Sequence, residues 1–324
     1  MSNAIHKKIN DIQPNDFIEG CYALRHYELR SYSGKPYIVM ELGDSSGRIK
    51  AVYWGEDSDM VSRRLEIVPV VRVEGVGNEY KGKCELKLDL VAPAEDDDYK
   101  LEEFLPTGER PREELEEELK DTIEIIENKH LAKLLKIVFI DENIHDKFMK
   151  WPAGKLWHGA YLGGLAEHSI NVAKICQFAA KFYKFCRKDL LITGALLHDI
   201  GKIEEFQVSS HFDYSVSGRL NGHIVIGDKM ISRIVGSIEN FPNELGEELS
   251  HMILSHHGET EFGSPVKPMT IEAIILHFAD CMDSQANAYS HIVEKYLDSN
   301  EPFSSWIRPI ERYLYLEGYR SDSE

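Results

Sequence analysis

Seven histidine and aspartate side chains in the second half of the chain are the residues whose types and spacing best suit chemistry. They are His168, the pair His198–Asp199, His223, the pair His256–His257, and Asp280. Imidazole nitrogens and carboxylate oxygens are ligands that divalent ions such as Mn²⁺, Fe²⁺, Zn²⁺ and Mg²⁺ accept, and no cysteine accompanies them here. A nitrogen and oxygen donor set without thiolate indicates a hydrolytic rather than a structural metal site.

The segments around these residues indicate that the set is more than a scatter of polar residues. His198–Asp199 closes the apolar segment LLITGALLHDIGK, and Asp280 lies within IEAIILHFADCMD. A histidine or aspartate in such a helix is costly to bury unless it is paired or bound to a metal. A single helical histidine is more often a surface or hydrogen-bonded core residue, so the prediction depends on the whole pattern.

The local strings EHS, LLHDIGK, GHIVIGDKMI and ILSHHGE produce the pattern H…HD…H…HH…D over about residues 160–290. This pattern resembles the HD-domain metal phosphohydrolases. The resemblance implies two divalent ions, the first held by His168, His198, Asp199 and Asp280, and the second by His223, His256 and His257. Asp199 would bridge the two ions and is therefore expected to be catalytic. Two-metal sites of this kind activate water and hold the oxygens of a phosphodiester.

Further residues near the pattern are candidates for substrate contact. Lys202 follows the His–Asp pair by one turn and resembles the family lysine that meets a substrate phosphate; the alternative is a cation stabilised by a helix dipole. Gly258 and Ser264 lie in the segment GETEFGSP, which follows the pair His256–His257. We expect this loop to line the substrate entrance, with a plain helix–helix connection as the alternative.

The sequence pattern of the N-terminal third of the chain predicts short strands. The β-like runs are Gly20–Leu29, Pro36–Leu42, Arg48–Trp54, Val68–Val76 and Glu85–Ala92, separated by turn-forming residues. Five strands in about 75 residues suit a small barrel, for which the oligonucleotide-binding OB-fold is the commonest architecture. We therefore predict an all-β OB-like domain over residues 1–94.

Aromatic residues are frequent in this segment, and an OB-fold stacks bases on such side chains. Tyr22, Tyr37 and Trp54 are the candidates that we name for base stacking, with Tyr27, Tyr32 and Tyr53 nearby. The alternative is that these rings fill the core of the barrel.

Residues 95–127 are predicted to form an acidic linker and helix, and residues 128–324 an all-α domain. Leu115, Leu119, Ile123 and Ile126 recur at helical spacing in the linker. The net charge of −18 is unevenly spread, because residues 95–127 hold 4 Lys and Arg against 15 Asp and Glu. This acidity argues against a broad basic footprint for nucleic acid but leaves room for a local groove.

The combination of a small barrel, an acidic linker and the segment SHHGETEFGSPVKPMTIEAIILHFADCMDS is similar to the YhaM family of 3′-to-5′ exoribonucleases. The similarity implies single-stranded RNA as substrate, single-stranded DNA as a second one, and Mn²⁺ as the preferred ion, with Fe, Co, Zn, Mg or Ni as other occupants. Two different functions stay open. One is a phosphohydrolase of small or cyclic nucleotides, although the GYP string of cyclic-dinucleotide hydrolases is absent; the other is a non-catalytic nucleic-acid-binding protein.

The composition of the chain indicates the cellular compartment in which we expect the protein. The hydrophobic fraction of 43% and the charged fraction of 28% are those of an ordinary globular protein. No apolar run reaches the roughly 18 residues that span a bilayer, and five scattered cysteines without a CxxC pair suggest reduced thiols. We expect a cytoplasmic protein without membrane contact, and we leave homo-oligomer formation open.

Overall fold

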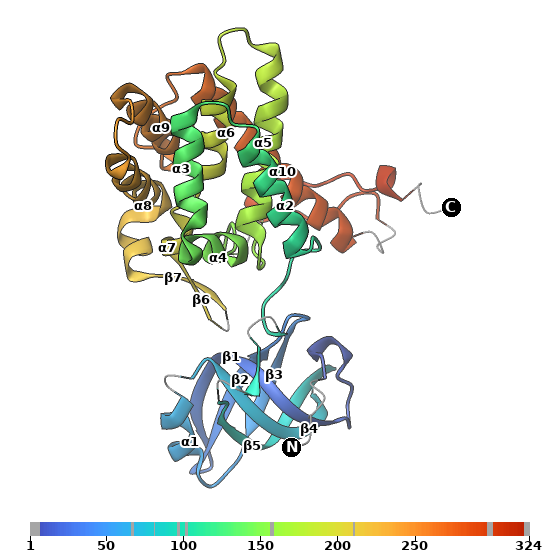
Figure 1. Ribbon diagram of the computed structural model, residues 1–324. Coiled ribbons are helices and arrows are strands. Elements are labelled where there is room, and N and C mark those ends of the chain that lie inside the picture. The colour runs from blue at the N-terminus through green and yellow to red at the C-terminus, as the bar shows by residue number, and fades with distance from the viewer. Residues whose placement is uncertain are drawn as a thin grey trace. The chain divides into compact units, whose positions relative to one another are not determined.

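A computed structural model describes residues 7–65, 68–80, 82–95, 98–100, 103–155, 159–209, 211–296 and 301–320 (Figure 1). The chain divides into two compact units. One comprises Met1–Thr107 with Gln207–Asp213, and the other comprises Gly108–Phe206 with Tyr214–Glu324. The division falls between Thr107 and Gly108, so the helix in the expected linker belongs to the helical unit.

The N-terminal unit is built on a closed barrel with the strand order β1-β2-β3-β5-β4. Its strands are β1 (Phe17–Tyr32), β2 (Lys35–Gly43), β3 (Arg48–Tyr53), β4 (Val70–Tyr80) and β5 (Lys83–Pro93). Neighbouring strands pair antiparallel except for β3 and β5, which are parallel. Helix α1 (Ser58–Leu65) connects β3 to β4. The predicted OB-like barrel is thereby confirmed.

The barrel closes around side chains that alternate along its strands. Ile38, Met40 and Leu42 on β2 are almost completely buried, as are Ile18 and Tyr22 on β1. A spacing of two residues places successive core residues on the same face of a strand, which is why the sequence pattern located the strands correctly.

The second unit is helical, as predicted. A short hairpin of β6 (Phe206–Val208) and β7 (Phe212–Tyr214) separates the two parts of its sequence. Its helices are α2 (Arg112–Glu124), α3 (Lys129–Ile140), α4 (Glu142–Lys150), α5 (Gly164–Ala179), α6 (Lys188–Leu197), α7 (Lys202–Glu205), α8 (Val216–Ser237), α9 (Asn243–Ser255) and α10 (Ile271–Tyr296). No described helix is both long and apolar enough to cross a membrane.

Helix α6 is the central element of this unit. Every residue from Leu190 to Leu197 is buried, which an apolar helix requires because it has no polar face to turn towards water. Helices α5, α9 and α10 contribute core residues around it, among them Leu165, Ile253 and Leu276. These helices, their C-terminal ends and α8 carry the histidines and aspartates identified from the sequence, so the apolar core fixes the positions of those polar side chains.

Candidate metal centre

Six of the seven predicted ligands come together in the helical unit as two groups of three. His168, His198 and Asp280 form the first, and His223, His256 and His257 form the second. Within each group the potential ligand atoms lie within 4.8 Å of one another. These residues come from α5, α8, α10 and the ends of α6 and α9, so the site exists only once the bundle has folded.

Asp199 lies between the two groups and presents one carboxylate oxygen to each. Its Oδ2 lies 3.4 Å from Nε2 of His198 and 3.6 Å from Nε2 of His168. Its Oδ1 lies 3.4 Å from Nε2 of His223 and 3.6 Å from Nε2 of His256. This is the placement that a bridging carboxylate requires.

Two of the histidines are oriented by the same local device. His198 and His256 are the C-terminal capping residues of α6 and α9, and each Nδ1 lies 2.7 Å from the backbone oxygen three residues earlier, in Ala195 and Ile253. Carbonyl groups in the last turn of a helix lack helical partners, so the imidazole satisfies one of them. A carbonyl only accepts, so Nδ1 carries the proton and Nε2 keeps its lone pair.

In the other three histidines Nδ1 also has a hydrogen-bond partner. His257 Nδ1 lies 2.8 Å from the backbone oxygen of Phe262. Nδ1 of His168 lies 2.7 Å from Oδ2 of Asp283, and Nδ1 of His223 lies 3.2 Å from Oε1 of Glu205. Partners of this kind fix the ring orientation of metal-binding histidines and make them better ligands. All five imidazoles in the two groups therefore direct Nε2 into the site.

The residues fit a pair of divalent cations. Oδ1 of Asp199 and Nε2 of both His223 and His256 are buried and have no hydrogen-bond partner within the described part of the chain. Buried polar atoms without partners are unfavourable, and these three atoms converge on the same space. A donor set of imidazole and carboxylate suits first-row divalent ions and Mg²⁺, and a cation would satisfy all three atoms.

The electrostatics keep most of the donors in the form that a cation needs. Burial alone would raise the pKa of Asp199, but the Lys202 ammonium and His198 hold it well below its usual value. Burial lowers the pKa of His256 well below its usual value and also lowers that of His257. His168 differs: burial lowers its pKa, but Asp280 and Asp283 outweigh this and raise it to about 9. A cation that bound to His168 would therefore displace a proton.

Lys202 lies at the edge of this site, where α7 begins. Its Nζ donates a hydrogen bond to Oδ2 of Asp199 at 2.6 Å, and the side chain is only 10% exposed. Lys202 is the first residue of the four-residue helix α7 and follows the end of α6 at Leu197 by five residues. The ammonium therefore lies next to the carboxylate of Asp199 that faces both groups.

The loop after His256–His257 packs against His277. Gly258 has a φ of +79°, and a Cβ atom there would lie 2.3 Å from Cε1 of His277. His277 in turn lies with Nδ1 2.8 Å from the backbone oxygen of His256. Gly258 thus allows an imidazole to pack against the chain that carries two ligands. Ser264 is only 3% exposed and its hydroxyl is buried, so little of this side chain is available to a substrate.

The aromatic residues of the barrel separate into core and surface. Tyr22 is completely buried and donates a hydrogen bond to the backbone oxygen of Lys7, so its predicted role in base stacking is wrong. Tyr37 and Trp54 stack on each other with ring centroids 4.1 Å apart, and Trp54 is 46% exposed. Tyr32 meets Trp54 edge-on at 6.5 Å. These three rings form an aromatic cluster at the surface of the barrel.

Two carboxylates at the site escaped the sequence analysis. Asp283 follows the candidate ligand Asp280 by three residues, which places both on one face of α10, and that spacing is the signal that could have identified it. Glu205 accepts from the backbone N–H of His223 at 3.0 Å, a contact between segments that the sequence does not reveal.

Replacing Asp283 with asparagine is expected to weaken metal binding about 10- to 100-fold. The amide keeps the size of the side chain but loses the charge that orients and polarises His168. Isothermal titration calorimetry of the chelator-treated protein with Mn²⁺ measures the change in metal affinity. Asp146→Asn on the exposed face of α4 is the matched control, and equal affinities for the two variants would contradict the role of Asp283.

Comparison with known proteins gives two results. Residues 165–285 match the HD domain family. A 3′-5′ exoribonuclease named YhaM from Bacillus subtilis (strain 168) is 32% identical over 267 residues, which cover 81% of this chain and 83% of the relative. Proteins of the same name from Geobacillus sp. (strain WCH70) and Listeria welshimeri are 33% and 30% identical, again over 81% of this chain and at least 80% of each relative.

Proposed function

The chain belongs to the YhaM family of 3′-5′ exoribonucleases, and we infer from this membership that it is a metal-dependent enzyme that shortens RNA from its 3′ end. The observation that supports this most is the position of Asp199, with one oxygen towards each group of histidines. A site of that form suits hydrolysis of a phosphodiester, in which the attacking and leaving oxygens both need charge stabilisation.

We propose that His168, His198, Asp199 and Asp280 hold one divalent ion, and that His223, His256, His257 and Asp199 hold the second. Mn²⁺ is the preferred ion in this proposal, with Fe, Co, Zn, Mg or Ni as alternative occupants, because sites of this donor type bind according to availability as well as affinity. When bound, the ions supply Lewis-acid activation of water and neutralise the charge on the phosphodiester oxygens.

The protein's own residues position the substrate. The Lys202 ammonium lies 2.6 Å from the bridging carboxylate, where it offsets the negative charge that grows on a phosphate during cleavage. Gly258 keeps the loop after the ligand pair closely packed on His277. In the barrel, Tyr37 and Trp54 offer a stacking surface for the bases of single-stranded RNA, a mode of contact that tolerates many sequences.

A single assay separates this function from its alternatives. A 5′-labelled single-stranded RNA of 20 nucleotides is incubated with the protein and Mn²⁺, beside a circular RNA of the same sequence. A ladder that shortens from the 3′ end, with nucleoside monophosphates as product and an intact circle, is expected. Cleavage of the circle, or turnover confined to mononucleotides or cyclic dinucleotides, would overturn the proposal. A DNA oligomer in parallel shows whether the 2′-hydroxyl is needed.

A further inference from the structure

The corner between α5 and α6, residues 178–188, has an unusual composition for this chain. Residues 168–188 contain five Lys or Arg and no Asp or Glu, and no longer stretch of the chain is free of acidic residues. Helix α5 ends at Ala179, a short 3-10 turn follows over Ala180–Phe182, and α6 begins at Lys188. Lys174 of this stretch is paired with Glu118, so the excess of positive charge is concentrated in the corner, which carries Lys181, Lys184, Arg187 and Lys188.

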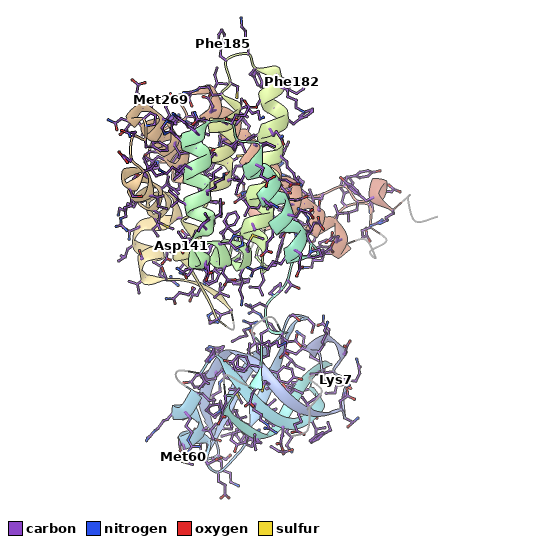
Figure 2. All side chains as sticks on the ribbon, in the orientation of Figure 1. Lys7, Met60, Asp141, Phe182, Phe185 and Met269 are labelled. Atoms are coloured by element: carbon purple, nitrogen blue, oxygen red, sulfur yellow. The ribbon has the colours of Figure 1, made fainter. Side chains whose placement is uncertain are left out.

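The same corner exposes four large aromatic side chains. Phe178, Phe182, Tyr183 and Phe185 are 62%, 67%, 54% and 76% exposed. In Figure 1 the chain between α5 and α6 projects beyond the neighbouring helices, and Figure 2 shows Phe182 and Phe185 there, directed away from the body of the unit. Single exposed apolar residues are ordinary, but four aromatics within eight residues mark a binding surface.

Cations lie beside these rings. Lys181 lies over the ring of Phe178 at 5.8 Å, and Lys184 lies over the ring of Phe185 at 5.5 Å. Within the described residues neither lysine forms an ion pair, whereas Arg187 is paired with Glu248 at 2.6 Å and with Glu272 at 3.1 Å. The corner therefore presents two unneutralised ammonium groups next to exposed aromatic faces.

We propose that the α5–α6 corner binds single-stranded RNA, stacking bases on its aromatic rings and holding phosphates with Lys181 and Lys184; this rests on the proposed exonuclease function. Stacking platforms next to positive charge are the usual means of binding single strands without sequence preference. The polyanionic substrate is repelled by the acidic chain as a whole, so it can approach most easily at a stretch that has no acidic residue of its own and that carries Lys181 and Lys184 outside any described ion pair.

The position of the corner gives it a role in processing long substrates. Helix α5 carries the ligand His168 near its start and Phe178 near its end, ten residues later, which is about 15 Å along the helix axis. An RNA whose 3′ end occupies the metal site would have to be several nucleotides long to reach the corner. The corner should therefore matter for long substrates and not for the shortest ones.

Kinetics on two substrate lengths test the proposal. The variants are Lys181→Glu/Lys184→Glu and Phe178→Ala/Phe182→Ala, all at exposed positions, and the control is Lys133→Glu/Lys136→Glu on the exposed face of α3. Both corner variants are expected to raise KM for a 20-nucleotide RNA about 10-fold, or about 1.4 kcal/mol. Trinucleotide kinetics and the control should stay within about 2-fold. The plot of log affinity against log salt concentration falls with a negative slope. The lysine variant should make this slope shallower by about 1.4, because two phosphate contacts are lost.

Several outcomes would overturn the proposal. They are an unchanged KM for the 20-nucleotide RNA, an equal effect of the α3 control, an equal loss on the trinucleotide, or binding to anionic lipid vesicles that the corner variants abolish while their RNA kinetics stay unchanged. If the unaltered protein cleaves no RNA, the proposed function fails on its own. Fluorescence anisotropy of a labelled 20-nucleotide RNA with the full-length variants then still decides whether the corner binds RNA.

Discussion

An Asp199→Asn variant is expected to lose exonuclease activity by at least about 10³-fold, which is about 4 kcal/mol of transition-state stabilisation. Asp199 is 2% exposed and directs one oxygen to each histidine group, so its replacement weakens both metal positions at once. An amide has one oxygen and no charge, so it cannot bridge two cations as a carboxylate does.

The measurement is kcat on single-stranded RNA with Mn²⁺, together with the metal content of the purified variant. Asp121→Asn, at an exposed position on α2, controls for the chemical change, and circular dichroism shows whether the helical unit stays folded. Activity and metal content close to those of the unaltered protein would show that Asp199 does not bridge the ions.

A Lys202→Gln variant is expected to show two separate losses. Without metal, Asp199 loses its ammonium partner and remains a buried charge, so the free energy of unfolding should fall by roughly 3 kcal/mol. Bound cations replace the ammonium as partners of the carboxylate, so most of this loss should disappear when Mn²⁺ is added. The kcat on RNA should fall about 10²-fold at saturating metal, because the charge next to the phosphate is gone.

Thermal unfolding with and without Mn²⁺, compared with RNA kinetics, measures both effects. Lys229→Gln on the exposed side of α8 is the matched control, and Lys202→Arg should restore part of the stability because it keeps the charge. A stability loss that Mn²⁺ does not relieve, or an unchanged kcat, would contradict the proposed position of Lys202 beside the ions and the phosphate.

Much of the fold could be predicted from the sequence because its signals are local. The alternation of Ile38, Met40 and Leu42 indicates a strand, and the apolar run of α6 indicates a buried helix. The division between the units was harder to place. Leu115 and Leu119 give α2 its helical periodicity, but only the folded structure reveals that they join the core of the helical unit.

The grouping of the candidate metal ligands could be predicted for a different reason. Histidine and aspartate are rare in apolar helices, so their presence at His198, Asp199 and Asp280 was itself informative. Asp283 and Glu205 could not be identified in this way, because carboxylates are common and only their contacts with His168 and His223 distinguish them.

The aromatic residues show the limit of reasoning from residue type. Tyr22 and Tyr37 both lie in predicted strands, yet Tyr22 is completely buried whereas Tyr37 stacks on the partly exposed Trp54. The register and the closure of the barrel decide which face of a strand points inward, and neither is encoded in a single segment. The exposed rings of the α5–α6 corner likewise become notable only when their surroundings are known.

Metal titration tests the two-ion centre most directly. The chelator-treated protein is titrated with Mn²⁺ while bound metal and cleavage of 5′-labelled RNA are followed in the same samples. We expect two ions per chain, with exonuclease activity appearing as they bind and remaining absent in Asp199→Asn. Full activity with a single bound ion, or without any, would contradict a centre in which Asp199 bridges two cations.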